Sequence, residues 1–219
     1  MSRSYEQRCF IARALDVLGE RWTLLIVREL TLGPRRYGEL LAALQGLGTS
    51  LLASRLKSLE EHGVIRRTAP GGAGRAYELA ERGEALIPLL GSLAEWGAGL
   101  GQSPPEYADM AAWRLVAMRL TAPAEAAQFR TLTQLVVDDE QFWVHGDGEK
   151  VRTQIGLAPV TPGLRMSCDR ATFTALARGR VTVGRAVAAG RLALDGDPED
   201  AGLFFRLFTL PGLDAQLSS

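Results

Sequence analysis

Two short amphipathic segments joined by a glycine-bearing turn restrict the fold of this chain more than any other feature. The first segment places apolar side chains at i, i+3, i+4 and i+7: Tyr37, Leu40, Leu41 and Leu44. The second segment carries a stripe of three leucines: Leu52, Leu56 and Leu59. Residues 45–48 between them include two glycines, so the connection is a tight turn. The pattern predicts a helix-turn-helix.

The flanking sequence extends this motif. An earlier helix is indicated by apolar residues at helical spacing, Trp22, Leu25, Ile26 and Leu30, and Gly33-Pro34 ends it. After Gly63, two strand-like segments (residues 64–68 and 75–79) surround a glycine-rich tip at 70–74. A hairpin directly behind the second helix is a wing, and helical spacing resumes from Gly83 to Trp96.

The side chains opposite the leucine stripe of the second helix are compact, polar or basic: Thr49, Ser50, Ala53, Ser54 and Lys57. The major groove of DNA accepts a helix whose outer face is narrow and donates hydrogen bonds. An ordinary solvated helix face is the alternative. The turn and the wing favour the DNA-binding interpretation.

Arginine supplies nearly all the positive charge, with only Lys57 and Lys150 as lysines. Guanidinium suits phosphate and guanine, although a general compositional bias towards arginine explains the count equally well. Arg35 and Arg36 precede the first helix of the pair, and Arg75 lies beside the wing tip. The predicted DNA contacts are Arg35, Arg36, Thr49, Ser50, Ser54, Arg55, Lys57 and Arg75.

Several segments resemble the HxlR family of bacterial winged-helix regulators across residues 5–100. They are Cys9 and residues 14–19, 22–26, 33–40, 55–60, 63–67, 77–79 and 96–97. The resemblance implies a homodimer whose first and last helices pack between subunits, and a helix around residues 49–62 in the major groove of double-stranded DNA. Two positions depart from the family pattern. Tyr37 stands where phenylalanine is usual, and Ala80 replaces a threonine that caps the last helix.

The character of the sequence changes near residues 97–105, where glycine and proline cluster. We expect a DNA-binding and dimerisation domain over residues 1–103 and a second domain over 104–219. The formal charge of zero divides into 13 basic and 11 acidic residues before this boundary and 12 and 14 after it. Neither half is a polycation, so any DNA affinity depends on where the arginines lie.

Strand-like alternation marks the second half. A helix around Trp113–Leu120 precedes candidate strands at residues 132–137, 142–145, 151–155 and 164–168. The loops between the first three strands predict antiparallel succession, since Asp147-Gly148 is a hairpin turn. Helices at 173–177 and 183–190, a short strand at 191–195 and a helix that Asp197 caps complete the pattern. The fold class is α+β: a winged helix-turn-helix, then a small antiparallel sheet covered by helices.

This second half resembles the sterol-carrier-protein-like domain over about residues 110–210. The matching segments are the hairpin at 147–148, residues 176–179 and residues 186–197. The resemblance implies an apolar ligand between the sheet and its helices. The candidate lining residues are aromatic: Trp113, Phe142, Trp143, Phe173, Phe204, Phe205 and Phe208. Core packing is the alternative role. Adjacency predicts that Phe204 or Phe205 leaves the main core face and that Phe142 and Trp143 occupy opposite sheet faces.

No enzymatic or cofactor motif is present: the sequence lacks a P-loop, G-x-G-x-x-G and G-x-S-x-G. His62 and His145 have no metal-ligand spacing to the cysteines, and residues 138–140 fit a solvated turn better than a cation site. We therefore expect no enzyme, no cofactor and no metal. The longest uncharged stretch, residues 40–54, is too short and polar for a membrane span, and nothing resembles a signal peptide, so we expect a cytoplasmic protein.

Three hypotheses follow. The first is a homodimeric regulator, named provisionally as a repressor, whose DNA affinity responds to an apolar effector in the second domain. The second is a thiol-based redox regulator that uses Cys9, with a structural second domain; a buried, structural Cys9 is the default, and Cys168 is assigned to the core. The third is a lipid carrier or enzyme-like binding protein with a degenerate winged helix.

Overall fold

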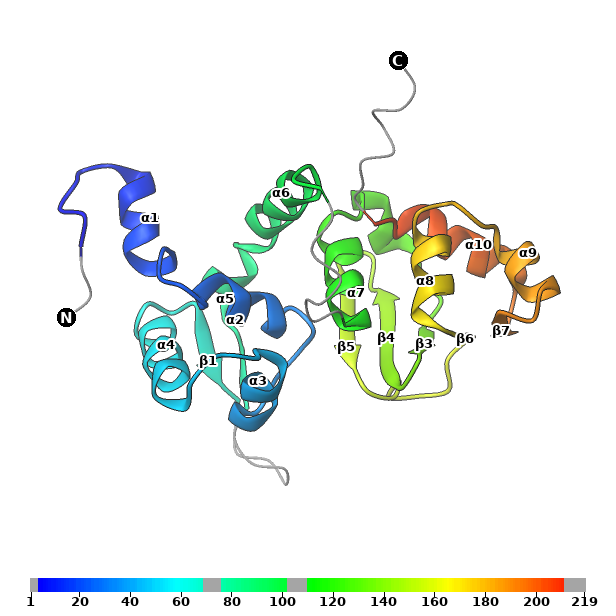
Figure 1. Cartoon of the computed structure of the whole chain (residues 1–219), viewed down its shortest axis with the longest axis horizontal. Coiled ribbons are helices and arrows are strands. Elements are labelled where there is room, and N and C mark those ends of the chain that lie inside the picture. The colour runs from blue at the N-terminus through cyan, green and yellow to red at the C-terminus, as the bar shows by residue number, and fades with distance from the viewer. Residues whose placement is uncertain (1–3, 69–75, 102–109, 211–219) are drawn as a thin grey trace, which may run out of the picture. The chain divides into compact units, whose positions relative to one another are not determined.

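The computed structural model describes residues 4–68, 76–101 and 110–210 (Figure 1). The chain divides into two compact units, Met1–Leu90 and Gly91–Ser219. The division falls inside a helix, whereas the expected boundary at residues 103 and 104 lies outside the described residues.

The N-terminal unit contains helices α1 (Phe10–Leu18), α2 (Thr23–Leu30), α3 (Tyr37–Ala43) and α4 (Thr49–Glu61). Strands β1 (Ile65–Arg67) and β2 (Tyr77–Leu79) follow, and then α5 (Glu81–Glu84) and the start of α6 (Ile87–Ala98). Helix pair and hairpin occur in the predicted order, which confirms the helix-turn-helix and the two strands of the wing. The wing tip falls at residues 69–75, outside the described residues.

The single helix expected from Gly83 to Trp96 is instead two helices, α5 and α6. Pro88 explains the break: it lacks the N–H that a continuous helix needs, and it sits in the first turn of α6, where this is tolerated. Gly83 places α5 against the wing, since a Cβ at this position would meet the Val64 carbonyl oxygen. The N-cap of α5 is Ala80, which makes no side-chain capping bond.

The predicted apolar stripes form the core of this unit. The stripe residues of the predicted α4 helix and several of those predicted for the two preceding helices are buried: Ile26, Leu30, Leu40, Leu44, Leu52, Leu56 and Leu59. Leu25, predicted in the same stripe, is 39% exposed. The Tyr37 hydroxyl donates a hydrogen bond of 2.6 Å to the Thr49 carbonyl, a contact that phenylalanine cannot make. Tyr37 therefore joins the first residues of α3 and α4.

A backbone bridge ties the wing to the chain between α2 and α3. Strands β1 and β2 are antiparallel, with Ile65 opposite Leu79 and Arg67 opposite Tyr77. Beyond β2, the Arg35 N–H donates to the Tyr77 carbonyl at 2.9 Å, and the Tyr77 N–H donates to the Arg35 carbonyl at 2.7 Å. Arg35 therefore acts as a one-residue third strand beside β2.

The C-terminal unit contains a sheet of order β5-β4-β3-β6-β7. Its strands are β3 (Thr133–Val137), β4 (Glu140–Gly146), β5 (Val151–Ile155), β6 (Leu164–Cys168) and β7 (Leu192–Asp195). The predicted succession of antiparallel strands is wrong for one pair, because β6 runs parallel to β3. The chain crosses from one edge of the sheet to the far side of β3, rather than adding β6 beside β5.

The side chain of Gln134 hydrogen-bonds the backbone of the segment that leaves β5 to make this crossing. It is 2% exposed in the middle of β3. Its amide nitrogen donates to the Phe142 carbonyl at 2.9 Å and the Gly156 carbonyl at 3.2 Å, and its amide oxygen accepts the Ala158 N–H at 2.7 Å. The residues that follow β5 are thereby held against the Gln134 side of the sheet, and a buried amide is satisfied.

Helices α7 (Ala111–Leu120), η1 (Ala124–Gln128), α8 (Arg170–Ala177), α9 (Val183–Ala188) and α10 (Pro198–Leu207) complete the unit (Figure 1). Three helices begin at side-chain caps: Asp169 accepts the Thr172 N–H, Thr182 the Arg185 N–H and Asp197 the Glu199 N–H. The predicted cap at Asp197, with Pro198 behind it, is confirmed. Among the described residues, no helix is long and apolar enough to cross a membrane.

Candidate nucleic-acid interface

The outer face of α4 is the strongest candidate for contact with nucleic acid. The leucine stripe on the inner side of α4 is fully buried. The five side chains predicted on the outer face are all exposed: Thr49, Ser50, Ala53, Ser54 and Lys57. The face is narrow because none of its members except Lys57 is long. A helix with such a face enters a major groove and presents hydroxyl groups to base edges.

The N-terminus of α4 suits a phosphate. Gly48 occupies the N-cap and makes no side-chain capping bond, so the first N–H groups of α4 are left for other acceptors. A helix N-terminus carries partial positive charge that attracts anions. Thr49 and Ser50 add hydroxyl groups at the same place.

Two basic side chains project outward beside this face. Arg36 is exposed at the N-cap of α3, and its backbone N–H donates to the Glu39 carboxylate at 2.7 Å. The Lys57 side chain is 78% exposed and lies 3.8 Å from Glu61, one turn further along α4. An exposed pair at this distance is weak, so Lys57 can exchange Glu61 for a phosphate.

Two other predicted DNA contacts are occupied inside the unit. The Arg55 Nη2 lies 2.7 Å from the Glu20 carboxylate, and its Nε donates to the Arg21 carbonyl at 3.3 Å. The Arg35 side chain is 12% exposed and pairs with Glu29. Arg75 lies outside the described residues.

A buried carboxylate, which the sequence analysis did not single out, holds Arg35. Glu29 is fully buried near the end of α2. One of its oxygens accepts from Arg28 at 2.7 Å and the other from Arg35 at 3.4 Å. The sequence does contain a signal that could have identified Glu29: an acidic residue that lies between the apolar residues Val27 and Leu30, both of which are buried.

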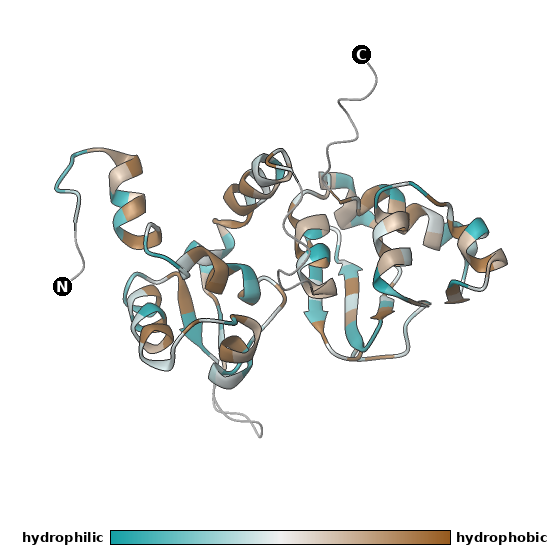
Figure 2. Ribbon diagram, in the orientation of Figure 1, coloured by the Kyte–Doolittle hydropathy of each residue, from teal (hydrophilic) through white to brown (hydrophobic). Residues whose placement is uncertain are grey.

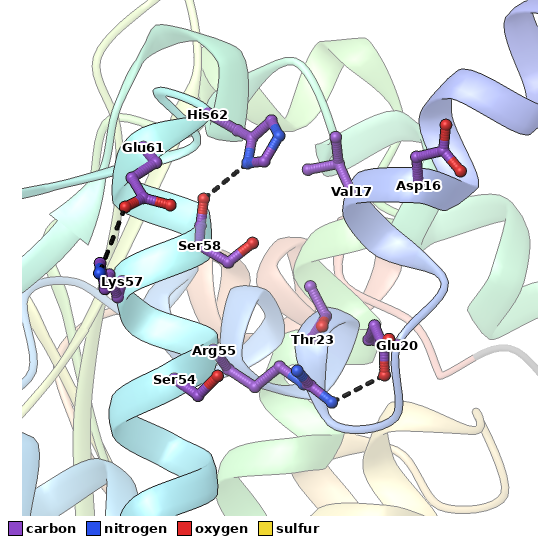
Figure 3. A pocket seen from close by; sticks show the side chains of 10 residues that line it. All are labelled: Asp16, Val17, Glu20, Thr23, Ser54, Arg55, Lys57, Ser58, Glu61 and His62. Atoms are coloured by element: carbon purple, nitrogen blue, oxygen red, sulfur yellow. Dashed lines mark hydrogen bonds and ion pairs between the residues drawn. The ribbon is translucent and has the colours of Figure 1, made fainter. Parts of the chain in front are cut away.

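A polar hollow of about 370 Å³ lies against the other side of α4 (Figure 3). It is lined by the end of α1, the chain that joins α1 to α2, the first residue of α2, and the C-terminal half of α4. The lining residues are Asp16, Val17, Glu20, Thr23, Ser54, Arg55, Lys57, Ser58, Glu61 and His62. Ser54 and Lys57 therefore belong both to the hollow and to the predicted DNA face.

Hydrophobic residues lie along α1 and α6, the two helices that the family resemblance places between subunits (Figure 2). On α1, Phe10 and Ile11 are 85% and 72% exposed, and on α6, Trp96 is 68% exposed. Exposed apolar clusters of this kind mark surfaces that associate.

The aromatic residues of the C-terminal unit are packed tightly. Phe204 contacts three other phenylalanine rings with centroid distances of 4.7–5.8 Å: Phe129, Phe205 and Phe208. Phe142 and Phe173 are each 1% exposed. Phe129, which the sequence analysis left out, belongs to the same cluster.

The two pairs of adjacent aromatic residues differ in burial. Phe204 and Phe205 are both buried, at 0% and 8% exposure, because α8 supplies a second apolar surface where Phe173 meets Phe205. Phe142 and Trp143 do occupy opposite faces of β4, the first buried and the second half-buried, as predicted. Trp113 on α7 is also half-buried.

The two cysteines differ in environment. Cys9 is exposed at the N-cap of α1, so the default of a buried, structural thiol is wrong. Cys168 at the end of β6 is half-buried, and burial raises the pKa of its thiol to about 12. Only Cys9 combines exposure with a position outside the core.

Two of the three acidic residues at 138–140 have structural partners. Asp138 pairs with Arg170 at 3.1 Å, and the Glu140 carboxylate accepts the Ala111 and Ala112 N–H groups at the start of α7. At the neighbouring hairpin, N–H groups of Lys150 and Glu149 and the Arg152 side chain hold the pKa of Asp147 well below its usual range. Among the described residues, no three His, Cys, Asp or Glu side chains are grouped so that they could hold a metal ion.

The helix pair, the wing and the polar outer face of α4 together define a winged helix-turn-helix of the DNA-binding class. The model of the HxlR-like helix-turn-helix family matches residues 17–104. The chain belongs to this family, and its N-terminal part is a helix-turn-helix transcriptional regulator.

Curated relatives share this part of the chain. The uncharacterised HTH-type transcriptional regulator YvaP of Bacillus subtilis is 42% identical over 86 residues, which are 38% of this chain and 80% of YvaP. The regulator sll1512 of Synechocystis is 40% identical over 92 residues, covering 41% of this chain and 68% of that protein. The reduced form of the transcriptional regulator YodB from B. subtilis aligns at 28% identity and TM-score 0.39, over 47% of this chain and all of YodB.

Replacing Glu29 with glutamine should destabilise the N-terminal unit by about 3 kcal/mol, because Arg28 and Arg35 lose a buried charge partner. The matched control is Glu78→Gln, which removes a carboxylate from the more exposed 2.8 Å pair with Arg66 and should change stability by less than about 1 kcal/mol. Hydrogen exchange of the backbone amides in α2 and α3 measures both effects. Equal effects of the two substitutions would contradict the role assigned to Glu29.

Proposed function

We propose that this chain is a homodimeric transcriptional regulator that binds a pseudo-palindromic DNA operator through α4. The single observation that carries the proposal is the outer face of α4, with five exposed compact or basic side chains opposite a buried leucine stripe, in a member of a helix-turn-helix family. A groove-reading helix needs such a face, whereas a degenerate winged helix does not.

Dimerisation is supported by the exposed apolar side chains of α1 and α6. A two-fold dimer presents two copies of α4 to half-sites about one helical turn apart, about 34 Å. Two weak half-site interactions then combine, which suits a protein whose N-terminal part carries little net charge.

The predicted contacts divide by chemistry. Arg36 and Lys57 bind phosphates, while Thr49, Ser50 and Ser54 donate to phosphates or base edges. Arg35 pairs with Glu29 and Arg55 pairs with Glu20, so both arginines help to position the helix-turn-helix. Direct contact of Arg35, Arg55 and Arg75 with DNA stays a prediction.

Replacing Lys57 with alanine should weaken binding to a duplex from upstream of the chain's own gene by about tenfold, and should lower the slope of log affinity against log salt by about 1. Arg36→Ala should act in the same way. Fluorescence anisotropy at several salt concentrations measures both quantities. Arg165→Ala, an exposed arginine of the C-terminal unit, is the matched control and should leave the affinity unchanged. Wild-type binding that does not distinguish this duplex from a scrambled one would contradict the proposal.

We also propose that an apolar small molecule in the C-terminal unit modulates this activity. Support comes from the sheet and its aromatic cluster, which fit the sterol-carrier-like resemblance of residues 110–210. A ligand that enters between sheet and helices must displace or rearrange this packing. It can alter DNA affinity only if it binds the two functional states unequally.

Palmitate, as a probe of this site, should raise the melting temperature of the full chain, by about 10 °C at a hundredfold excess over its Kd. Phe205→Leu should reduce the increase, because Phe205 is a predicted lining residue. Phe129→Leu is the matched control in the same cluster: it should lower the basal melting temperature similarly but leave the increase intact. Anisotropy with palmitate then measures the effect on DNA affinity. No increase in the wild type, or an equal loss in both variants, would count against the effector site.

The exposure of Cys9 favours a second candidate function, a thiol-based redox regulator. In this case diamide should change DNA affinity in the wild type and in Cys168→Ser, but not in Cys9→Ser. The reason is that Cys168, with its raised pKa, stays a protonated thiol near neutral pH. Peptide mapping after iodoacetamide treatment should find the label on Cys9. If Cys9→Ser responded to diamide as the wild type does, the redox candidate would be excluded.

A further inference from the structure

Positive charge is concentrated in one segment of the C-terminal unit. Residues 170–194 include five arginines and form the longest stretch of the chain without Asp or Glu. The rest of residues 104–219 carries 7 basic and 14 acidic side chains, so the two signs of charge are separated within this half. A compositional bias towards arginine explains the number of arginines, but it does not explain the absence of carboxylates among them. A surface field of one sign attracts partners of the opposite sign.

Three of these arginines follow the path of the chain from the end of α8, through α9, to the edge strand β7 (Figure 1). Arg178 is the C-cap of α8, Arg185 lies in α9, and Arg191 directly precedes β7. All three residues are exposed. Val183 and Ala186 are buried on the inner side of α9, which leaves Arg185 on its outer side. We call Arg178, Arg185 and Arg191 the arginine strip.

The guanidinium groups of the arginine strip are available to a partner. None of the three forms an ion pair or a side-chain hydrogen bond with a residue that the structure describes. Arg170, in the same segment, pairs with Asp138 at 3.1 Å and so serves the fold instead. Asp169 caps α8, where hydrogen bonds from Thr172 and, less strongly, the charge of Arg191 hold the pKa of its carboxyl below the usual range. Asp169 therefore reduces the positive field at Arg191 but leaves its five N–H donors unbonded.

Duplex DNA fits the arginine strip better than a membrane surface does. Guanidinium groups bind phosphate oxygens through paired N–H donors, and both partners carry phosphates. A membrane-bound surface also presents several large apolar side chains to the lipid, whereas Val187, at 41%, is the only exposed large apolar side chain within residues 170–194. The chain belongs to a helix-turn-helix family, so DNA is the phosphate-bearing partner expected of its N-terminal part.

We propose that the arginine strip binds the phosphate backbone of duplex DNA that flanks the operator. Contacts with phosphates add affinity without reading the sequence. The covalent link between the two units raises the local concentration of the strip at any DNA that α4 holds. The placement on flanking DNA rests on the proposed function, whereas the affinity of the strip for duplex DNA does not.

Fluorescence anisotropy on the full chain with two duplexes tests the placement. The shorter duplex contains only the operator, and the longer one adds about 15 base pairs of random sequence on each side, which is about one and a half helical turns. We expect the wild type to bind the longer duplex at least fivefold more tightly and with a steeper dependence on salt. Equal affinity for the two duplexes would overturn the placement on flanking DNA.

The triple variant Arg178→Gln, Arg185→Gln and Arg191→Gln removes the charge of the strip. It should lose the gain from the longer duplex, lower the slope of log affinity against log salt on that duplex by about 2–3, and bind the operator alone as the wild type does. The matched control neutralises three exposed basic residues of the same unit outside the segment, and it should keep the gain: Arg130→Gln, Lys150→Gln and Arg165→Gln. An equal loss in both triple variants would reduce the effect to net charge and refute the strip.

Circular dichroism checks that both triple variants are folded, which is expected because every substituted residue is exposed. The single charge reversal Arg185→Glu provides an independent variant and should lower the affinity for the longer duplex at least threefold. An unchanged affinity in Arg185→Glu would contradict the role of α9 in the strip.

A scrambled duplex at low salt separates this inference from the proposed function. The strip variant should bind it at least fivefold more weakly than the wild type does. If the wild type did not distinguish operator from scrambled DNA but this difference remained, the proposed function would fail while the strip stood. No difference between wild type and strip variant on either the scrambled or the longer duplex would refute the strip.

Sedimentation with vesicles of phosphatidylcholine and phosphatidylglycerol tests the other phosphate-bearing surface. We expect the wild type and the strip variant to sediment equally. A strip variant that lost vesicle binding but kept the DNA affinity of the wild type would assign the strip to a membrane and overturn the proposal.

Discussion

The buried carboxylate of Glu29 is the interaction on which the geometry of the DNA-binding unit depends. It fixes Arg35, whose backbone forms the bridge to Tyr77 in the wing, and Arg35 also precedes α3. One charge thus links α2, the start of the helix-turn-helix and the wing. A buried carboxylate is tolerated only where cationic groups meet it, so the position of Arg35 and the burial of Glu29 require each other.

Helix α4 serves two surfaces at once. Its leucines bury one side, and the remaining circumference is divided between the exposed outer face and the wall of the hollow. Arg55 turns towards Glu20 in the wall of the hollow, whereas Lys57 borders both the hollow and the outer face. Ser54 and Lys57 therefore belong to both surfaces of α4.

The C-terminal unit depends on a different buried polar group. Gln134 satisfies both its amide oxygen and its nitrogen with the backbone that follows β5, and this arrangement accompanies the parallel pairing of β6 with β3. The phenylalanine cluster joins α8, α10 and Phe129, the residue that ends η1, through edge-to-face contacts. The unit is therefore held by one specific hydrogen-bonded crossing and one apolar cluster.

Local periodicity was enough to predict most of the helices and strands, though not α1 or η1, together with the leucine core of α4 and its exposed outer face, because helical and strand spacing are properties of adjacent residues. Pro88 shows that the break between α5 and α6 was also present in the sequence. Tertiary structure alone decided the rest. The ion pair of Arg55 with Glu20, the contact that buries Phe205 against Phe173 and the parallel strand β6 depend on segments distant in the chain. The pairing of Glu29 with Arg35 spans only six residues, but it forms because the chain turns between α2 and α3. Ion pairs, cavities and strand order arise from which elements meet, and no spacing along one element specifies that.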